Sequence, residues 1–283
     1  MYPIINLFGI HIGTYGLCIL LGGLAAFAVI LYCVKSRFGK EKNDFILAYI
    51  FSIAFSVLGA VLLKPVINTI IVAVHYENYK SMSFDHILTF VFGEVVFYGG
   101  LTGAILGLAF YCRMYKTPLL PLLDIGAVGV PLAHAVGRVG CMFGGCCWGT
   151  VTVQDNPFSI IYPAYPMEAP SGITAPSGIP LWNVPIMEAA FLVILFIINF
   201  IIYHRSRRNV ICFVVYLLLY GTWRFAIEYI RGDAIRGKYY IFTTSQYISI
   251  FLIIAGILIL AKISKRTSPK NKLNEIKNEK QEK

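Results

Sequence analysis

The chain has 283 residues, of which 58% are hydrophobic and only 13% are charged. Soluble domains average about 25% charged residues, so this composition excludes an ordinary soluble protein and indicates an integral membrane protein. The formal net charge is +10, and eight of the 24 Lys and Arg residues fall in the last 22 positions. A basic tail after an apolar segment is typical of a cytoplasmic membrane face. Nothing else favours a nucleic-acid partner, so none is expected.

Seven apolar segments approach the length of about 20 residues that a helix needs to cross a bilayer. In chain order they are 14–34, 45–74, 98–115, 118–142, 185–203, 210–230 and 245–263. The second is too long for one straight span, and Lys64-Pro65 predicts a break or kink within it. Residues 84–97 are apolar but short, which favours an interfacial or re-entrant segment. Residues 1–16 contain no Lys or Arg, so no secretory signal peptide is expected.

The charges between these segments alternate. The loops after the first, third and fifth segments, together with the tail, contain 17 Lys and Arg residues. The loops on the other side contain 4. The positive-inside rule therefore predicts an all-α integral membrane protein of about seven spans, with its N-terminus outside and its C-terminus in the cytoplasm. Residues 1–263 would form one polytopic domain, and residues 264–283 a disordered basic tail. Residues 150–184, with six prolines and no Lys or Arg, would be an extracytoplasmic cap.

Arg138 lies in an apolar stretch, within the motif G-R-V-G-C-M-F-G-G-C-C-W-G at residues 137–149. A charged side chain near the bilayer centre costs at least about 2.5–3.5 kcal/mol, so an arginine there indicates a function. Its planar fork of donors suits a phosphate, and the phosphate available in a membrane is a phospholipid headgroup. The neighbouring glycines would let a headgroup approach. The alternative is a tight helix end with a snorkelling arginine.

A second cluster contains Arg224, Glu228 and Arg231, spaced i, i+4 and i+7 on an expected helix. Glu228 can pair with either arginine, which would leave the other partly available for an anion. A structural ladder of ion pairs is the alternative. In a third motif, residues 97–103, glycines again predict close packing beside Tyr98. Taken alone, that tyrosine is typical of the aromatic belt at a membrane interface.

Three of the seven cysteines, Cys141, Cys146 and Cys147, form a C-x4-C-C cluster. Small packing residues near glycines are the favoured interpretation. A metal site would want a fourth ligand, for which His134 is a possible donor, and a C-x2-C spacing. A redox pair is a further alternative. No metal and no cofactor are therefore expected.

Together these motifs resemble the bacterial prolipoprotein diacylglyceryl transferase family. Residues 137–149 are similar to its signature G-R-x-G-N-F-x-N-G-E-x-x-G, and residues 98–103 to its H-G-G-L-x-G. Further similarities are Y-G-L at 15–17 and S-Q-x-x-S at 245–249. Residues 223–233, W-R-F-A-I-E-Y-I-R-G-D, look like the family's F-R-x-x-x-E-x-x-R-x-x-D. The order and spacing of the motifs cover nearly the whole chain.

The resemblance implies a multi-pass protein of the bacterial inner membrane. It would transfer the diacylglyceryl group of phosphatidylglycerol to the lipobox cysteine in a prolipoprotein signal peptide, releasing glycerol phosphate. Arg138 and Arg224 would bind and stabilise the phosphate, and Glu228 would orient an arginine. The remaining expected site residues contact lipid or support the arginines: Tyr15, Gly99, Gly100, Gly137, Gly140, Glu188 and Arg231.

The sequence departs from the family where a proton must move. Tyr98 stands at the family histidine, so it becomes the candidate proton acceptor, and Cys141, Gly144 and Cys146 replace Asn, Asn and Glu. Phosphate binding is therefore better supported than thiol activation. Two other functions stay open: a non-catalytic or differently specific phospholipid-binding or translocating protein, and a small-anion transporter. The chain shows no inverted repeat, which disfavours the transporter.

Overall fold

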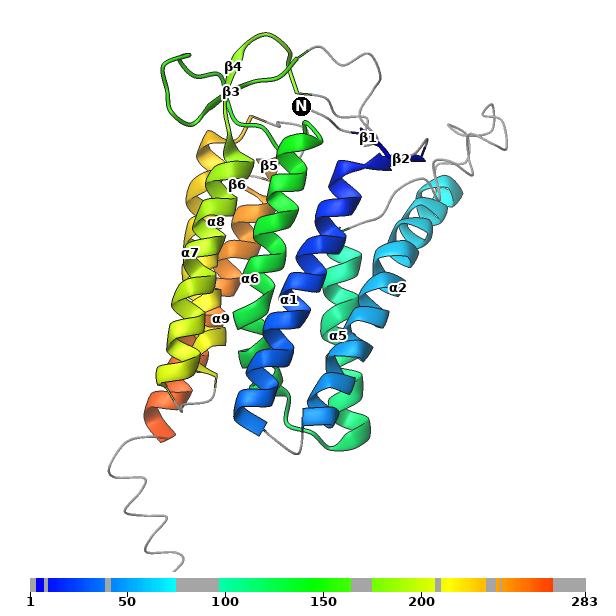
Figure 1. The fold of residues 1–283 in the computed structure, drawn as a ribbon, viewed down its shortest axis with the longest axis vertical. Helices are drawn as coiled ribbons and strands as arrows, with labels where there is room; N and C mark the ends of the chain where they lie inside the picture. The colour runs from blue at the N-terminus through cyan, green and yellow to red at the C-terminus, as the bar shows by residue number, and fades with distance from the viewer. Residues whose placement is uncertain are drawn as a thin grey trace, which may run out of the picture. The chain divides into compact units, whose positions relative to one another are not determined.

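A computed structural model describes residues 4–7, 10–38, 42–74, 97–163, 175–206, 210–232, 238–239 and 241–266. Within them it contains seven long helices (Figure 1): α1 (Thr14–Phe38), α2 (Lys42–Val74), α5 (Phe97–Tyr115), α6 (Leu119–Phe143), α7 (Val184–Arg205), α8 (Ile211–Ile227) and α9 (Thr244–Arg266). All except α5 are long and apolar enough to cross a membrane. The all-α membrane class is therefore confirmed, whereas the count of seven spans and the orientation of the termini stay predictions.

The helix boundaries lie within a few residues of the expected ones, with one correction. A break at Lys64-Pro65 is excluded, because α2 runs from Lys42 to Val74 with Pro65 inside it, whereas the alternative of a kink stays a prediction. Helices in apolar surroundings tolerate proline when neighbouring groups satisfy the freed carbonyl. Of the expected re-entrant segment 84–97, all but Phe97 lies outside the described residues, as does the tail after Arg266.

In the described residues, three short antiparallel strand pairs, which the hydropathy pattern did not predict, lie between or before the helices. They pair β1 (Ile4–Leu7) with β2 (Ile10–Gly13), β3 (Ser159–Ile161) with β4 (Pro180–Trp182), and β5 (Lys238–Tyr239) with β6 (Phe242–Thr243). The second strand pair belongs to the expected cap, and Leu181 of β4 packs in a small core with Trp148, Tyr162 and Ala175. Part of the cap is therefore a folded element.

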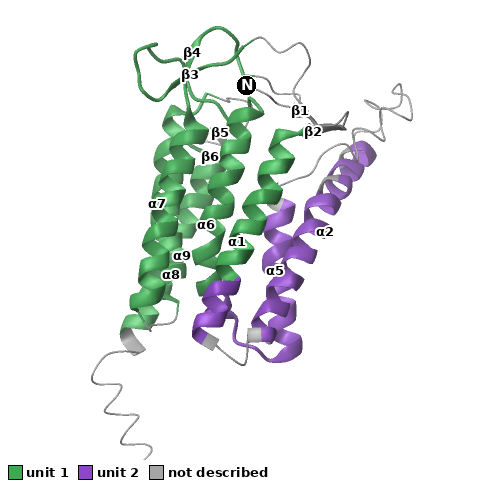
Figure 2. Ribbon diagram, in the orientation of Figure 1, with its two compact units in different colours: residues 1–30, 123–283 green, residues 31–122 purple. Residues whose placement is uncertain are grey.

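The chain divides into two compact units (Figure 2), residues 1–30 with 123–283 and residues 31–122. The smaller unit is built on the packing of α2 against α5. Gly99, Gly103 and Gly107 recur every four residues on α5, and a Cβ at Gly103 would collide with the Phe55 carbonyl on α2. Small residues at this spacing let two helix backbones approach closely, as in membrane helix pairs. The close packing expected from the glycines of residues 97–103 is thus confirmed.

The larger unit packs the first part of α1 and most of α6 with α7, α8 and α9. Its apolar centre joins three helices, with Ala135 from α6, Leu192 and Leu195 from α7, and Tyr216 from α8. Gly22 lets α1 approach α6 at Ala133. These contacts fix the helices that carry the polar groups described below.

Buried polar groups tie the same helices together at their other end. The Asn199 amide on α7 donates to the Ala127 carbonyl on α6 at 2.8 Å. The Asp124 carboxylate on α6 accepts a hydrogen bond of 3.1 Å from the backbone N–H of Phe213 in the first turn of α8. Val210, the N-cap of α8, makes no side-chain cap. A residue of another helix therefore satisfies one of the N–H groups that a helix start leaves open.

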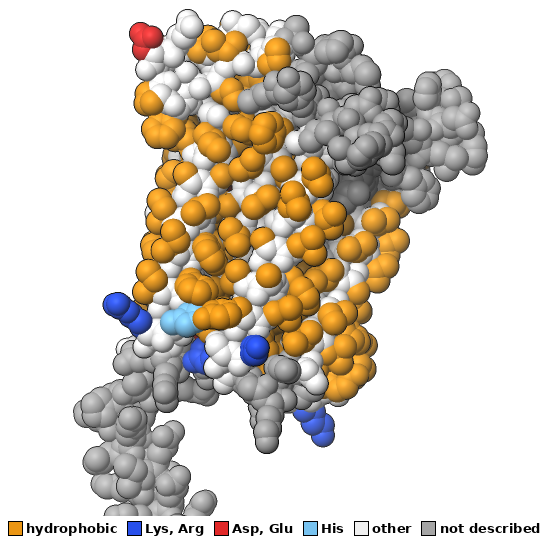
Figure 3. Space-filling model, viewed as in Figure 1, with side chains coloured by type: hydrophobic (Ala, Val, Ile, Leu, Met, Phe, Trp, Pro, Cys, Tyr) orange, Lys and Arg blue, Asp and Glu red, His pale blue; other side chains and the backbone are white. Residues whose placement is uncertain are grey.

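Large apolar side chains point outward along the helices. Examples are Leu24, Ile194 and Phe251, which are 58%, 56% and 70% exposed, and hydrophobic side chains dominate the face shown in Figure 3. A soluble protein rarely exposes such a continuous apolar surface. The surface matches helices that face lipid.

Candidate active site

A buried ion pair joins α6 to α7. The Arg138 Nη2 atom lies 3.1 Å from the Glu188 Oε1 atom, and Glu188 is completely buried whereas the Arg138 side chain keeps 15% of its surface exposed. Glu188 sits in the second turn of α7, whose start is capped by the Asn183 side chain through the Ile186 N–H. The carboxylate is thus sealed inside, and the guanidinium is the group of the pair that a ligand can reach.

Two more side chains complete this polar cluster. The Arg138 Nε–H donates to the His134 Nε2 atom at 3.2 Å, one helical turn earlier on α6. The Tyr220 hydroxyl of α8 donates to Glu188 Oε1 at 3.2 Å, and its ring meets the His134 ring edge-on. His134 and Glu188 therefore fix two sides of the guanidinium. Within the described residues, Arg138 Nη1 makes no hydrogen bond, so the fork keeps donors for an anion.

Arg224, on the last turn of α8, has a different environment. Its Nη1 atom lies 2.7 Å from Glu228 Oε2, and its Nη2 atom donates to the Ser245 hydroxyl of α9 at 2.8 Å. Both charged side chains are nearly buried, at 9% and 5% exposure. Glu228 thus pairs with Arg224, which settles an alternative that the sequence left open. Arg224 is the more fully engaged of the two arginines, and Arg138 is the more accessible one.

The motif at residues 245–249 has a structural explanation. Thr243 and Gln246 form a capping box at the start of α9: Gln246 N–H donates to the Thr243 hydroxyl, and Thr243 N–H donates to the Gln246 side chain. Ser249 donates to the Ser245 carbonyl. The cap fixes the first turn of α9, and with it the Ser245 hydroxyl that holds Arg224.

Arg231 corrects the expected helix face. Helix α8 ends at Ile227, a short 3₁₀ turn η2 (Glu228–Ile230) follows, and Arg231 leaves the helix to form a β-bridge with Gly149. The expectation that Arg224 and Arg231 lie on one face of the same helix is therefore wrong. The charges of Arg138, Arg224 and Arg231 nonetheless all act on Glu188. The site is thus rich in cations, which favours an anionic ligand.

The glycine motif ends in a tightly held turn. The Gly149 N–H donates to the Trp182 carbonyl, the Gly232 N–H donates to the Trp148 carbonyl, and a Cβ at Gly149 would collide with Trp182. Only glycine fits between these chains. The turn after α6 is thereby fastened both to the cap and to the segment that carries Arg231.

The expected lipid-binding residues fall into two groups. Gly137 and Gly140 lie where α6 meets α1, since a Cβ at Gly137 would touch Ile19 and one at Gly140 would touch Cys18 and Tyr15. Tyr15 is 44% exposed at the start of α1, so it borders the end of α6 that carries Arg138. Their contact with lipid stays a prediction.

The second group belongs to the smaller unit. Gly99 and Gly100 are buried against α2, where a Cβ at Gly99 would collide with the Gly59 carbonyl. Helix packing therefore explains both glycines. Tyr98 lies in the first turn of α5, and its side chain lies outside what the structure describes. Its role as proton acceptor stays a prediction.

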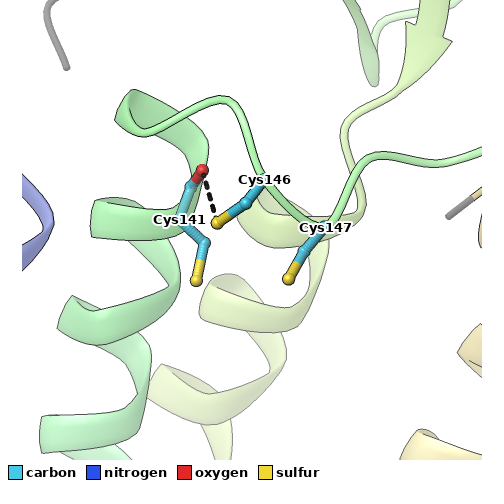
Figure 4. A group of neighbouring side chains, drawn as sticks. All are labelled: Cys141, Cys146 and Cys147. Atoms are coloured by element: carbon cyan, nitrogen blue, oxygen red, sulfur yellow. Dashed lines mark hydrogen bonds between the residues drawn. The ribbon is translucent and has the colours of Figure 1, made fainter. Parts of the chain in front are cut away.

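The structure brings the three clustered cysteines together. The sulfur atoms of Cys141, Cys146 and Cys147 all lie within 4.8 Å of one another, and the Cys146 thiol points to the Cys141 carbonyl (Figure 4). His134, the fourth ligand considered from the sequence, does not belong to this group and bonds Arg138 instead. Hydrogen bonds from the other two thiols, with the nearby charges of Arg231 and Arg138, lower the pKa of Cys147 below its ordinary value.

Sequence reasoning missed three contributors to this site. The sequence presents His134 only as a possible metal ligand and Ser245 only as part of the motif at residues 245–249, and it gives Tyr220 no role. One signal was available for Tyr220, because Tyr216, Tyr220 and Arg224 are spaced four residues apart and so share a helix face. The same spacing was available for His134, which precedes Arg138 by four residues, whereas no local signal links Ser245 to an arginine.

Comparison with known proteins gives a consistent result. Residues 3–262 match the family model described as prolipoprotein diacylglyceryl transferase. The chain is 31% identical over 256 residues to phosphatidylglycerol–prolipoprotein diacylglyceryl transferase 2 of Clostridium perfringens, covering 90% of this chain and 92% of the relative. It is 30% identical over 260 residues to phosphatidylglycerol–prolipoprotein diacylglyceryl transferase of Clostridium tetani, covering 92% of this chain and 96% of the relative. With its apolar helices and its buried arginines, the chain belongs to the prolipoprotein diacylglyceryl transferase family of membrane-bound transferases.

Proposed function

We propose that this protein transfers the diacylglyceryl group of phosphatidylglycerol to the lipobox cysteine of a prolipoprotein, in the bacterial inner membrane. The observation that carries the proposal is Arg138, a guanidinium fixed on two sides by Glu188 and His134 while its Nη1 atom makes no hydrogen bond in the described residues. The names of the relatives supply the two substrates, and the arginine supplies a place for the phosphate.

The chemistry explains why a fixed arginine is needed. The thiolate sulfur attacks a glycerol carbon of the lipid, a C–S bond forms, and the C–O bond to the phosphate breaks. The bonding electrons leave with glycerol phosphate, so negative charge grows on the phosphate oxygens. A guanidinium already oriented toward them stabilises that charge without reorganising. Its bidentate fork matches two phosphate oxygens.

The second arginine would act together with the first. Arg224 already pairs with Glu228 through Nη1 and donates to Ser245 through Nη2. Its contribution to phosphate binding is therefore chiefly the electrostatic field of a buried positive charge. Such a charge acts strongly in a dry site, where the effective dielectric constant is low. We therefore assign direct phosphate contact to Arg138 and electrostatic support to Arg224.

The attacking thiol must also lose its proton. His134 is poorly placed to accept it, because its Nε2 atom already accepts the Arg138 N–H; we assign it a positioning role. Tyr98 stays the proposed acceptor, as the residue that stands at the family histidine. The alternative function, phospholipid binding without transfer, rests on this departure from the family motif.

One experiment decides between transfer and binding. The purified protein is mixed with phosphatidylglycerol labelled in its acyl chains and with a lipobox peptide, and label on the peptide is measured. A peptide whose lipobox cysteine is replaced with serine is the matched control. Label on the cysteine peptide alone supports the transferase. Bound lipid without labelled peptide would instead support the non-catalytic alternative.

A further inference from the structure

The cysteines at the end of α6 form a cluster that the transfer reaction does not use. Cys141 lies in the last turn of α6, and Cys146 and Cys147 lie in the turn that follows the helix, yet all three sulfur atoms lie within 4.8 Å of one another. Figure 4 shows the side chains converging from the last turn of α6 and from the turn beyond it. None of the three is in a disulfide.

The turn is shaped to bring the thiols together. Cys147 adopts a left-handed backbone conformation with φ of 65°, which non-glycine residues seldom take. The Cys146 N–H and its thiol both point to the Cys141 carbonyl, at 3.1 Å and 3.5 Å. Strained conformations of this kind persist only where the surroundings enforce them, and they are concentrated at functional sites. Here the buried Trp148 and the bridged Gly149 hold the turn.

We propose that Cys141, Cys146 and Cys147 form a three-thiolate site for a thiophilic metal ion, with Zn²⁺ as the favoured ion. Thiolate ligands select Zn²⁺ and Cu⁺ among biological metals. With Zn–S bonds of about 2.3 Å, sulfur atoms around one tetrahedral ion lie about 3.8 Å apart, so the cluster needs only a small contraction. The fourth position would hold water, as in zinc sites with three protein ligands.

A divalent ion leaves the smaller residual charge on three thiolates. Three thiolates and Zn²⁺ leave a charge of −1, whereas three thiolates and Cu⁺ leave −2. Binding consumes no oxidant, because each thiol releases its proton to solvent as its sulfur binds the ion. Cys141 and Cys147 are nearly buried and Cys146 is half-buried, so Cys146 gives the ion its route in.

A redox pair explains the cluster less well. A disulfide joins two sulfur atoms at about 2.05 Å and would leave the third thiol unused. The adjacent pair Cys146 and Cys147 would have to close within one dipeptide. A metal ion uses all three sulfurs equally, as their arrangement suggests.

Metal binding to the full-length protein in detergent tests the proposal without any transfer assay. Reduced, metal-stripped protein is titrated with Zn²⁺ and, separately, with Co²⁺, whose sulfur-to-metal charge-transfer absorption reports thiolate ligands. The expected result is about one ion per chain, in line with a single cluster site. Elemental analysis of the protein as purified identifies the resident ion, and Cu⁺ in place of Zn²⁺ would still support the three-thiolate site.

Single substitutions then assign the ligands. Losing an outer partner of a metal site already weakens binding about 10–100-fold, so Cys146→Ser and Cys147→Ser should each weaken it at least as much. Cys112→Ser, which alters a half-buried thiol on α5, is the matched control and should bind like the parent. The proposal is overturned if Cys112→Ser loses as much metal affinity as the cluster variants do, or if the cluster variants bind the metal as tightly as the parent.

The parent protein provides a test that does not depend on variant folding. Bound Zn²⁺ should protect Cys146 from alkylation by N-ethylmaleimide, measured by mass spectrometry, while Cys112 reacts equally with and without the ion. Absence of metal binding by the reduced protein, or a disulfide within the cluster in protein purified without reductant and free of metal, would contradict the site.

Discussion

At the scale of single residues, the two arginines of the candidate site differ in how many of their donors are already hydrogen-bonded. Arg138 shares its buried carboxylate with the Tyr220 hydroxyl and leaves Nη1 without a hydrogen bond in the described residues. Arg224 is held by Glu228 and Ser245. A buried ion pair is weak evidence for stability, but breaking one side of it is costly. The ion pairs therefore hold the charged groups in place. Substituting one or both members of a pair tells the effect on lipid binding apart from the effect on folding stability.

The first prediction separates these two effects at Arg138. Arg138→Gln should lower transfer by about 100-fold or more, as expected for loss of a charge-stabilising donor. It should also destabilise the fold by about 3–5 kcal/mol, because Glu188 loses its buried partner. The double variant with Glu188→Gln should recover stability in a thermal-unfolding assay but not transfer.

Lysine should rescue either arginine only in part, since the bidentate fork is lost. Arg224→Gln should likewise weaken phosphatidylglycerol binding. If both glutamine variants bind the lipid as the parent does, the headgroup role of these arginines is wrong.

The second prediction concerns His134, which accepts the Arg138 N–H. His134→Leu removes the acceptor, and a hydrogen bond to a charged group is worth about 1.5–3 kcal/mol, so KM for the lipid should rise about tenfold or more. His134→Gln keeps an acceptor and should restore most of the binding. Equal KM values for the two variants would show that the imidazole only fills space.

The third prediction tests the proton acceptor. Tyrosine has an ordinary pKa of about 10, against about 6.5 for histidine, so Tyr98 is poorly matched to neutral pH. If it is the base, Tyr98→Phe abolishes transfer while lipid binding survives. Tyr98→His should then restore or raise the rate and shift the pH optimum downward. An unchanged rate in Tyr98→Phe would make this residue part of the aromatic belt.

At the scale of elements, glycines set how closely helices approach. On α5, Gly103 faces the Phe55 carbonyl of α2 without room for a methyl group, whereas Gly23 on α1 has nothing within 4 Å of its would-be Cβ. Capping works at the same scale, since Asp124 of α6 bonds the first turn of α8. Each helix is thus positioned by its neighbours as well as by its own sequence.

The fourth prediction compares two glycine substitutions. Gly103→Ala should destabilise the protein by about 1–3 kcal/mol, the usual cost of overpacking. Gly23→Ala should be neutral or stabilise the protein by up to about 1 kcal/mol, because alanine is more favourable than glycine inside a helix. Its Cβ would also have no other atom within 4 Å. Thermal unfolding in detergent measures both. Equal effects would mean that the α2–α5 contact tolerates a methyl group.

At the scale of the whole molecule, an apolar exterior and unevenly placed charges define how the chain sits in a membrane. Six of the described helices are long and apolar enough to span it, and α5 forms at the place of the remaining expected span. Lys and Arg concentrate in alternate loops and in the tail. Charge asymmetry of this kind sets orientation during insertion.

The fifth prediction is the resulting topology. A reporter that is active only in the cytoplasm should be active when it is fused after Lys283. A reporter that is active only outside the cytoplasm should be active when it is inserted at the exposed Gln154 of the cap. A membrane-impermeant thiol reagent applied to intact cells should label a cysteine placed at Gln154 and not one placed in the tail. Labelling of the tail from outside would overturn the orientation.

The sequence by itself determined the membrane class and the seven helical segments, and it singled out Arg138 and Arg224 as candidate phosphate ligands. These follow from local properties: runs of apolar residues fix the helices, and the cost of a charge in an apolar stretch singles out Arg138 and Arg224. The glycine spacing on α5 also predicted a close helix contact, which the α2–α5 packing confirms.

Only the tertiary structure decided which groups meet. It pairs Glu188 with Arg138 and Ser245 with Arg224, takes Arg231 off the helix, and brings Cys141 to the turn that follows it. With several arginines and glutamates in the chain, many pairings satisfy the same local chemistry. The choice among them depends on how helices pack and where a turn reverses, which contacts between distant segments fix.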